Sequence, residues 1–424
     1  MTPLPVRSRR RRAIASVLAA LILTAAVPAA SSGVSRHPNP SFAYVALTAN
    51  APGGTVIPLI NSGQTFDGET FEGIPDGIGI VPVGTGARYV DLYVNFEQSH
   101  VPFSGFADFE DSSVQRARLD LKKLQLTKLD EVLPASAGYI RFCSAFMAGP
   151  AEGFSDYTFF LNEESNDVID VPAGATYGAD PAVTPYRQAG YSVALNTKTG
   201  SFHQIAGAGR HNHENTVVVP GGWDQVVGLS GDDTFTAPGS QLYMYSADSP
   251  SAFVGDDGAL WAFQVTATDE GAVDPWDPQN NANDYMEIRT GDSWSGRFIP
   301  VPDDIARGTV PGVAPQTALE TWSNDNNVFQ FVRVEDMDYD PDNPRVVYFT
   351  DTGSTRIREA ASGRLTRPLA GDFPFFDTNG RVFKMVLNAD DPTVVDAFSI
   401  HAEGKLQLQE AADPPTDPPI VTVL

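Results

Sequence analysis

Four places in this sequence gather side chains that could bind metal ions or carry out acid–base chemistry. Each holds carboxylates, amides, histidines or a thiol beside an expected strand: Arg210-His211-Asn212-His213-Glu214-Asn215; Arg141-Phe142-Cys143-Ser144 with Asn162-Glu163-Glu164; Arg333-Val334-Glu335; and Gly231-Asp232-Asp233 with Asn95-Phe96-Glu97. Carboxylate and amide oxygens are typical ligands of Ca²⁺, whereas thiolates and imidazoles suit softer metals. The residue types therefore indicate a metal site.

The histidine segment is ambiguous by itself. His211, His213 and Glu214 precede a valine-rich strand. Their H-x-H-E spacing is not an established zinc signature, because no helix places the ligands on one face. They could equally be surface residues that follow a glycine-rich loop.

Glu163 and Glu164 end an apolar strand, and adjacent side chains of a strand point to opposite faces. One of the two should face the interior, where it needs a cation or several hydrogen-bond donors. Cys143 is the single cysteine, so no intrachain disulfide can form. Its thiol could be buried as a small hydrophobe, paired between chains or bound to a metal.

Arg333 and Glu335 are two residues apart in an expected strand, so their side chains should share a face. They could form a plain ion pair or a functional one. The acidic run that follows lacks the glycine of a calcium-binding EF-hand loop, and we predict a solvated turn for Asp336, Asp338, Asp340 and Asp342. The Gly231-Asp232-Asp233 and Asn95-Phe96-Glu97 segments could be simple turns.

The elements that must position these residues are short strands. The 37 glycines and 33 prolines are spread along the chain, as in folds with many tight turns. We expect strands at Tyr89–Phe96, Val114–Leu121, Tyr191–Asn196, Ser201–Ile205, Gln225–Leu229, Gln241–Tyr245, Ala259–Val265, Asn327–Val334, Val346–Thr350 and Arg381–Leu387. The recurring turn-then-strand unit predicts an all-β fold, a β-propeller of five to six blades with loop insertions, over residues 31–408.

Both ends of the chain differ from this body. The arginines at 7 and 9–12 precede the apolar run Ala13–Val27, which is shorter than the ~20 residues of a membrane-spanning helix. Residues 1–30 therefore indicate an export signal, and we predict a secreted or periplasmic protein with no membrane attachment after cleavage. The proline-rich residues 409–424 are expected to be a disordered tail.

The net charge is −25, and about −30 without the five arginines of the leader. A field of this sign repels nucleic acid and anionic lipid. An anionic small molecule could bind only where cations reverse the local charge.

Taken together and in order, several segments resemble the PhoX-type alkaline phosphatases, a family of exported β-propellers. The resemblance spans about residues 45–400 and rests on Val94–Glu97, Ala137–Gly149, Phe159–Glu164, Gly209–Asn215, Ser230–Asp233, Leu260–Val265 and Phe331–Pro341. It implies a monomeric, extracytoplasmic metal-dependent phosphomonoesterase that releases phosphate from small organic esters.

In that family a cysteine and several glutamates hold two Fe³⁺ ions, with Ca²⁺ bridged into the cluster. Carried over, the resemblance implies that the iron ligands are Cys143, one of Glu163 and Glu164, Glu214 and Glu335. Arg333 would hold the phosphate, and its catalytic partner would be Glu335. The calcium shell would draw on Asp232, Asp233, Asn95 and Glu97.

The sequence departs from the family in two ways. Asn95-Phe96-Glu97 lacks a histidine that the family carries there, and the closing C-terminal segment has no counterpart. We therefore expect a C-terminally shortened or divergent member. A calcium-dependent lactonase-type propeller and a non-catalytic, metal-stabilised propeller are alternatives.

Overall fold

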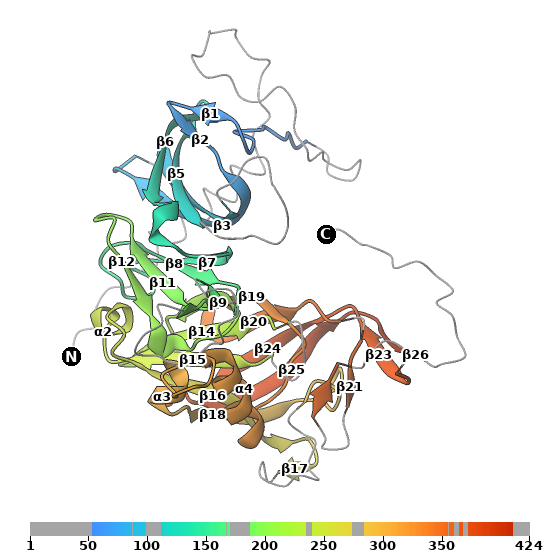
Figure 1. Cartoon of the computed structure of the whole chain (residues 1–424). Coiled ribbons are helices and arrows are strands. Elements are labelled where there is room, and N and C mark those ends of the chain that lie inside the picture. The colour runs from blue at the N-terminus through green and yellow to red at the C-terminus, as the bar shows by residue number, and fades with distance from the viewer. Residues whose placement is uncertain are drawn as a thin grey trace, which may run out of the picture.

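The computed structural model describes residues 53–86, 88–98, 112–166, 168–169, 187–234, 240–273, 284–354, 356–359, 364–367 and 372–409. The expected export signal lies outside these residues, as does all but the first residue of the expected tail. Strands dominate the described chain (Figure 1).

Two separate four-stranded antiparallel sheets come first. Each runs through its strands in chain order, so each is a meander of neighbouring hairpins. The first consists of β3 (Gly73–Val83), β4 (Tyr89–Gln98), β5 (Ser113–Asp120) and β6 (Gln125–Leu133), and the second of β7 (Phe142–Ala148), β8 (Thr158–Glu163), β11 (Ser192–Asn196) and β12 (Phe202–Ile205).

Two further meanders are joined into one larger sheet. The third contains β13 (His213–Val219), β14 (Val226–Asp232), β15 (Leu242–Ala247) and β16 (Ala259–Thr268), and the fourth contains β19 (Val334–Asp340), β20 (Asn343–Asp351), β24 (Arg381–Leu387) and β25 (Val394–Glu403). β18 (Trp294–Pro300) pairs with both β16 and β25, and this pairing links the two meanders.

The remaining elements are short. Three pairs consist of two-residue strands: β1 (Thr65–Phe66) with β2 (Glu69–Thr70), β9 (Val168–Ile169) with β10 (Arg187–Gln188), and β21 (Arg358–Glu359) with β22 (Leu365–Thr366). In addition, β17 (Gly271–Ala272) pairs with β16, and β23 (Phe375–Thr378) pairs with β26 (Leu406–Gln409). The helices are η1 (Ala135–Ala137), η2 (Ala206–Ala208), α2 (Pro250–Val254), α3 (Asp303–Ala306) and α4 (Pro315–Asp325).

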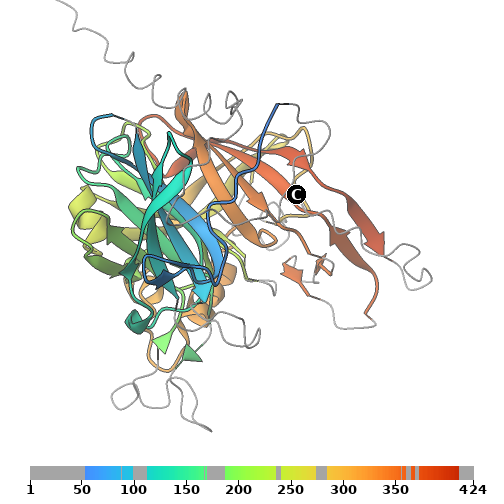
Figure 2. The ribbon, with the colours of Figure 1, turned by 90° about the horizontal axis from the view of Figure 1, so that it is seen from above.

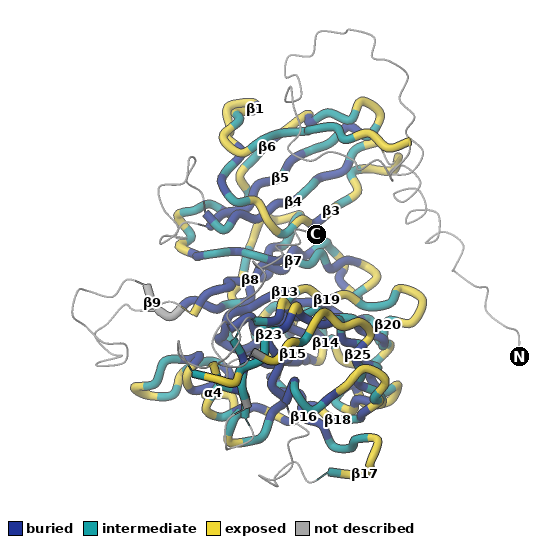
Figure 3. Tube along the Cα trace, turned by 90° about the vertical axis from the view of Figure 1, so that its right-hand side faces the viewer, coloured by how far each residue is buried: buried dark blue, intermediate teal, exposed yellow. Residues whose placement is uncertain are grey.

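The first strands of the four meanders pack in sequence order, with β3 against β7, β7 against β13, and β13 against β19. Figures 1 and 3 show the sheets following one another in this order, and Figure 3 shows buried residues along the strands. Figure 2 gives the view from above, in which the first two sheets overlap. This arrangement confirms the all-β, propeller-type prediction. The described residues contain four meanders, and β18 joins the last two at their outer edges. The number of five to six blades stays a prediction.

The largest core cluster lies within the joined sheet and is rich in phenylalanine. Phe263, Phe331, Phe383 and Phe398 are almost completely buried there, and their rings meet edge-to-face or stacked. Burial of one such side chain contributes about 1.5–3 kcal/mol. This core holds the strands that carry the candidate site.

One expectation from the sequence needs correction. The segment Asn327–Val334 is not a strand, because Asn327 and Arg333 have φ angles of 52° and 60°, which interrupt an extended chain. Its phenylalanines reach the core as a loop. The chain between β17 and β18 also reaches the core, since Tyr285 and Ile288 are fully buried; residues 274–283 lie outside the described chain.

Candidate metal centre

The acidic side chains predicted to meet come from neighbouring strands. Cys143 is the second residue of β7, Glu164 follows β8, Glu214 is the second residue of β13, and Glu335 is the second residue of β19. Because β7, β13 and β19 lie side by side, these positions fall at one shared end of the sheets. The fold therefore gathers residues that are up to 192 positions apart in the chain.

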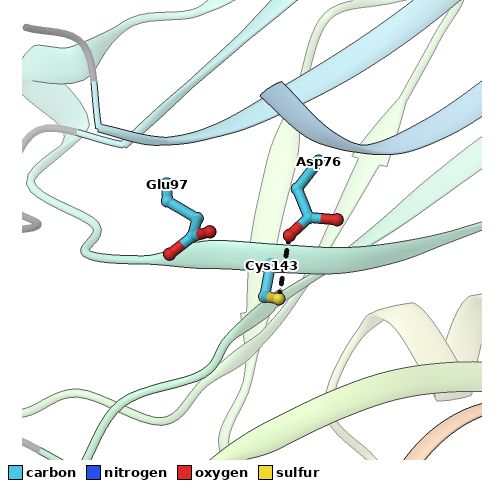
Figure 4. Close-up of side chains that lie close together, drawn as sticks. All are labelled: Asp76, Glu97 and Cys143. Atoms are coloured by element: carbon cyan, nitrogen blue, oxygen red, sulfur yellow. Dashed lines mark hydrogen bonds between the residues drawn. The ribbon is translucent and has the colours of Figure 1, made fainter. Parts of the chain in front are cut away.

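Two groups of possible ligand atoms share Cys143. Its Sγ lies with carboxylate oxygens of Asp76 and Glu97 in one group and with those of Glu164 and Glu214 in the other. Within each group the atoms lie within 4.8 Å of one another. The Cys143 Sγ donates a hydrogen bond to Asp76 Oδ2 at 3.0 Å, as Figure 4 shows.

Register shifts in two strand pairs orient the side chains of Glu214 and Asp76. The β13–β14 register shifts at Glu214, where Asn215 takes a φ of 56° and its N–H donates to the Ser144 hydroxyl. A second shift in the β3–β4 pairing, between Pro75 and Ile78, accompanies Asp76. Such bulges turn single side chains out of the regular alternation.

The electrostatic field of the cluster favours protonated carboxyls in the absence of a cation. Burial and the Asp76 carboxylate raise the pKa of Glu97 to about 7, and burial and Asp233 raise the pKa of Glu335 to about 7. Burial raises the pKa of Glu214 well above its usual value, and Glu164 adds to the effect. The pKa of the Cys143 thiol is likewise raised by burial and by the nearby carboxylates.

These residues fit a bound cation. Glu214 is 3% exposed, and its Oε2 has no hydrogen-bond partner among the described residues. A buried carboxylate oxygen in that position is costly unless a cation or a donor meets it. The donor set combines a thiol with carboxylates, which suits iron, and the oxygen atoms alone suit calcium.

Arg333 carries positive charge at the edge of the cluster. Its Nε and Nη2 donate to the two carboxylate oxygens of Asp233 at 2.9 and 3.0 Å, and Nη2 also lies 3.3 Å from Glu335 Oε1. The Thr352 hydroxyl donates to the same Glu335 oxygen. Arg333 and Glu335 thus meet as expected, although Arg333 precedes the strand.

Five predicted ligands lie outside the two groups: Asp233 and Glu335, which meet at Arg333, and Glu163, Asp232 and Asn95. The fully buried Glu163 accepts from the backbone N–H groups of Ile140 and Tyr191 at 3.0 and 3.1 Å. Asp232 accepts from Thr234 and Gln316. Asn95 donates its side-chain amide to the carbonyl oxygens of Cys143 and Ser144, which ties β4 to β7.

The two histidines are buried rather than exposed. The rings of His211 and His213 lie with their centroids 3.7 Å apart and tilted by 35°, and burial lowers the pKa of each. His213 hydrogen-bonds Ser230 and the Gly209 carbonyl. Neither histidine belongs to the two ligand groups.

Two acidic residues of this neighbourhood were missed from the sequence. Asp76 stands in the glycine-rich strand β3, where no motif marks it. Asp336 was assigned to a solvated turn, but it lies in β19, accepts from the Asn215 amide at 3.2 Å and contributes to the raised pKa of Glu214. Its position directly after Glu335 was the available signal. Asp338 and Asp340 also lie in β19, and only Pro341 and Asp342 form the turn.

No protein-family model matches this chain, and no curated protein matches it either. Among solved structures, the chain is similar to "Pseudomonas fluorescens PhoX in complex with vanadate, a transition state analogue". The TM-score is 0.53 at 13% sequence identity, over 78% of this chain and 67% of that one. At this identity the likeness shows a PhoX-like fold. In the described part of the chain, no helix has the length and apolarity needed to cross a membrane.

Proposed function

We propose that this protein is a metal-dependent phosphomonoesterase that releases phosphate from small organic esters. The observation that carries the proposal is the pair of ligand groups around Cys143 with Arg333 beside them. The PhoX-like fold supports it. We further propose an extracytoplasmic location, on the basis of the basic and apolar leader.

Cys143, Glu164 and Glu214 would hold one cation, and Asp76, Glu97 and Cys143 a second. Bound cations would supply Lewis acidity, neutralise charge on the phosphoryl oxygens and lower the pKa of water. Because both groups include the thiol, we propose that either could hold Fe³⁺, with Ca²⁺ bound by carboxylate oxygens of the same cluster. Asp233 and Asn95 would support these positions.

Arg333 would orient the phosphoryl group. Its planar guanidinium can donate to two phosphate oxygens at once, which a lysine cannot do in the same geometry. Asp233 fixes the guanidinium from the other side through two hydrogen bonds. Glu335 stands within 3.3 Å and could accept or return a proton near the reacting group. Hydrolysis would break the ester P–O bond, with water adding to phosphorus and the alcohol leaving with a proton.

The test is hydrolysis of p-nitrophenyl phosphate by purified protein, together with elemental analysis. We expect iron or calcium in the active protein and loss of turnover after chelation. Arg333→Ala or Glu335→Ala should each cost at least ~3 kcal/mol of transition-state stabilisation. Glu131→Gln, at an exposed position of β6, is the matched control and should leave turnover unchanged.

Active protein that contains neither metal would refute the proposal. Full metal occupancy without turnover on any phosphate ester would instead favour a non-catalytic propeller in which metals serve stability.

A further inference from the structure

One face of the fourth meander carries a wide, open hollow beside the candidate metal centre. Its volume is about 440 Å³, and most of the surface inside it belongs to apolar atoms. Small-molecule sites in proteins commonly have about 300–1,000 Å³. The residues of this face that line the hollow are Asp336, Asp338, Asp340, Tyr348, Thr350 and Val382.

The register of the strands places these side chains together. Alternate residues of β19 point to the same side, and the intervening Met337 is buried in the phenylalanine-rich core. Asp338 pairs with Tyr348 of β20, and Thr350 pairs with Val382 of β24. Paired residues of neighbouring strands share a face. The hollow therefore lies on the side of the fourth meander that points away from that core.

Asp336 connects the hollow to the metal centre. It directly follows Glu335 in the chain. Its Oδ1 accepts a hydrogen bond at 3.2 Å from the amide of Asn215, the residue after Glu214. A phosphomonoester held between Glu214 and Glu335 would therefore have this apolar surface next to its alcohol group.

The carboxylates at the hollow are not neutralised by cationic side chains. Asp336 accepts from the Asn215 amide, and Asp338 Oδ1 accepts from the Tyr339 N–H at 2.8 Å. Asp340 Oδ1 accepts from the backbone N–H two residues further on, also at 2.8 Å. In the described part of the chain, no lysine, arginine or histidine forms an ion pair with any of the three. The charge of this face favours a cationic ligand.

Tyr348 adds an aromatic ring to the same face. The Nζ of Lys384 lies 5.8 Å from the centroid of this ring. The face of an aromatic ring attracts cations, and quaternary ammonium groups are recognised in this way. A quaternary ammonium carries a positive charge without any N–H donor, so it suits a hollow of mostly apolar atoms near carboxylates. A primary ammonium would lose the hydrogen bonds of its N–H donors in such surroundings.

We propose that this hollow receives the alcohol part of the substrate, and that the preferred substrates are phosphomonoesters of short quaternary ammonium alcohols. This inference rests on the proposed function. Alternate residues of a strand are about 6.6 Å apart, so a cation at Asp338 would lie one such step from Asp336 at the edge of the metal centre. A two-carbon link between phosphate and nitrogen is of comparable length.

The kinetic test compares phosphocholine with 3,3-dimethylbutyl phosphate, which has the same shape but a carbon atom in place of the charged nitrogen. We expect the metal-loaded enzyme to favour phosphocholine at least tenfold in kcat/KM. Asp338→Asn/Asp340→Asn should reduce this ratio to within twofold of unity, mainly through the KM of phosphocholine. Asp248→Asn/Asp304→Asn removes the same number of charges at exposed positions that do not line the hollow, and it should leave the ratio unchanged. A ratio near unity in the wild type would overturn the inference.

Two further comparisons test the ring and the apolar lining. Tyr348→Phe keeps the ring and should keep the preference for phosphocholine, whereas Tyr348→Leu should reduce it at least threefold. Phosphoethanolamine should be a poorer substrate than phosphocholine, because its ammonium group carries three N–H donors. Equal preferences in the Phe and Leu variants would overturn the role of the ring. Faster turnover of phosphoethanolamine would overturn the selection of a quaternary ammonium.

A binding measurement separates this inference from the proposed function. Calorimetric titration of the metal-loaded protein with choline and with 3,3-dimethylbutan-1-ol requires no phosphate ester and no turnover. We expect at least fivefold tighter binding of choline, and loss of that difference in Asp338→Asn/Asp340→Asn. Equal affinity for the two alcohols, or an unchanged difference in the folded double variant, overturns the role of the hollow. Selective binding of choline without hydrolysis of any ester refutes only the proposed function.

Discussion

Arg333 donates two hydrogen bonds to Asp233, at 2.9 and 3.0 Å, although the residues are 100 positions apart in the chain. The pair lies beside the acidic cluster around Cys143, because Asp233 also interacts with Glu164. Asp233 is 1% exposed, so its charge must be met within the protein. This ion pair fixes the direction of the guanidinium at the edge of the acidic cluster.

Asp233→Asn should weaken catalysis by misplacing Arg333. The amide keeps the shape of the side chain but accepts only one of the two charge-assisted hydrogen bonds. We expect kcat/KM for p-nitrophenyl phosphate to fall about 10- to 100-fold, corresponding to about 1.4–2.7 kcal/mol. Asp120→Asn is the matched control, because Asp120 pairs with Arg88 at 2.9 Å at the end of the first sheet that lies opposite Glu97. If the Asp233 variant had wild-type kinetics, the Asp233–Arg333 ion pair would not be needed for turnover.

Metal removal should lower the thermal stability of the protein. A ligand that binds only the folded state stabilises it by about 2.7 kcal/mol at 100 times its Kd. We therefore expect chelation to reduce Tm by about 3–8 °C, and calcium with iron to restore it. Cys143→Ser should shrink this metal-dependent difference, whereas Glu131→Gln should preserve it. Equal Tm values with and without metal would speak against any cation in the cluster.

In the metal-free protein, the Glu335 carboxyl should contribute more to the free energy of unfolding at acid pH than at alkaline pH. Its folded-state pKa is raised to about 7 from 4.5. A raised carboxyl pKa contributes stability that is fully present below pH 4.5 and lost as the pH rises through 7. Glu335→Gln imitates the protonated form, so the variant and the wild type should agree at pH 4.5.

At pH 8, Glu335→Gln should be more stable than the metal-free wild type by about 1–3 kcal/mol. Urea unfolding of chelator-treated protein at both pH values measures this difference. A difference in the free energy of unfolding between the variant and the wild type that is larger at pH 4.5 than at pH 8 would contradict this prediction. In metal-loaded protein the order should reverse, because the variant lacks a charge that faces the cations.

Gly231→Ala should disturb the junction that brings Asp233 to Arg333. A Cβ at Gly231 would lie 2.7 Å from Val334 Cγ1 and 3.0 Å from the Val334 carbonyl oxygen. Overpacking of this kind costs about 1–3 kcal/mol. Gly86→Ala is the control, because a Cβ at Gly86 would meet no atom of the described chain within 4 Å. Thermal melts of both variants decide the prediction, and equal Tm values would contradict it.

Much of the strand content could be predicted from the sequence alone. Alternating or apolar runs with turn residues between them mark β5, β11, β15, β16, β20 and β24, because side-chain alternation is a local property of extended backbone. The segment Asn327–Val334 has the same apolar composition and yet forms a loop. Positive φ angles at Asn327 and Arg333 are imposed by tertiary packing, and no local pattern reveals them.

The sequence by itself determined which residue types were available for a site: a single thiol, several glutamates at strand ends and an arginine next to one of them. Only the tertiary structure decided which of these meet. Glu163 and Glu164 are neighbours in the chain, but Glu163 binds backbone N–H groups while Glu164 lies with Cys143. Asp76 joins the same thiol from a strand with no recognisable motif. Proximity of this kind depends on how β3, β7, β13 and β19 pack together, and the energy of that packing comes from contacts between segments far apart in the chain.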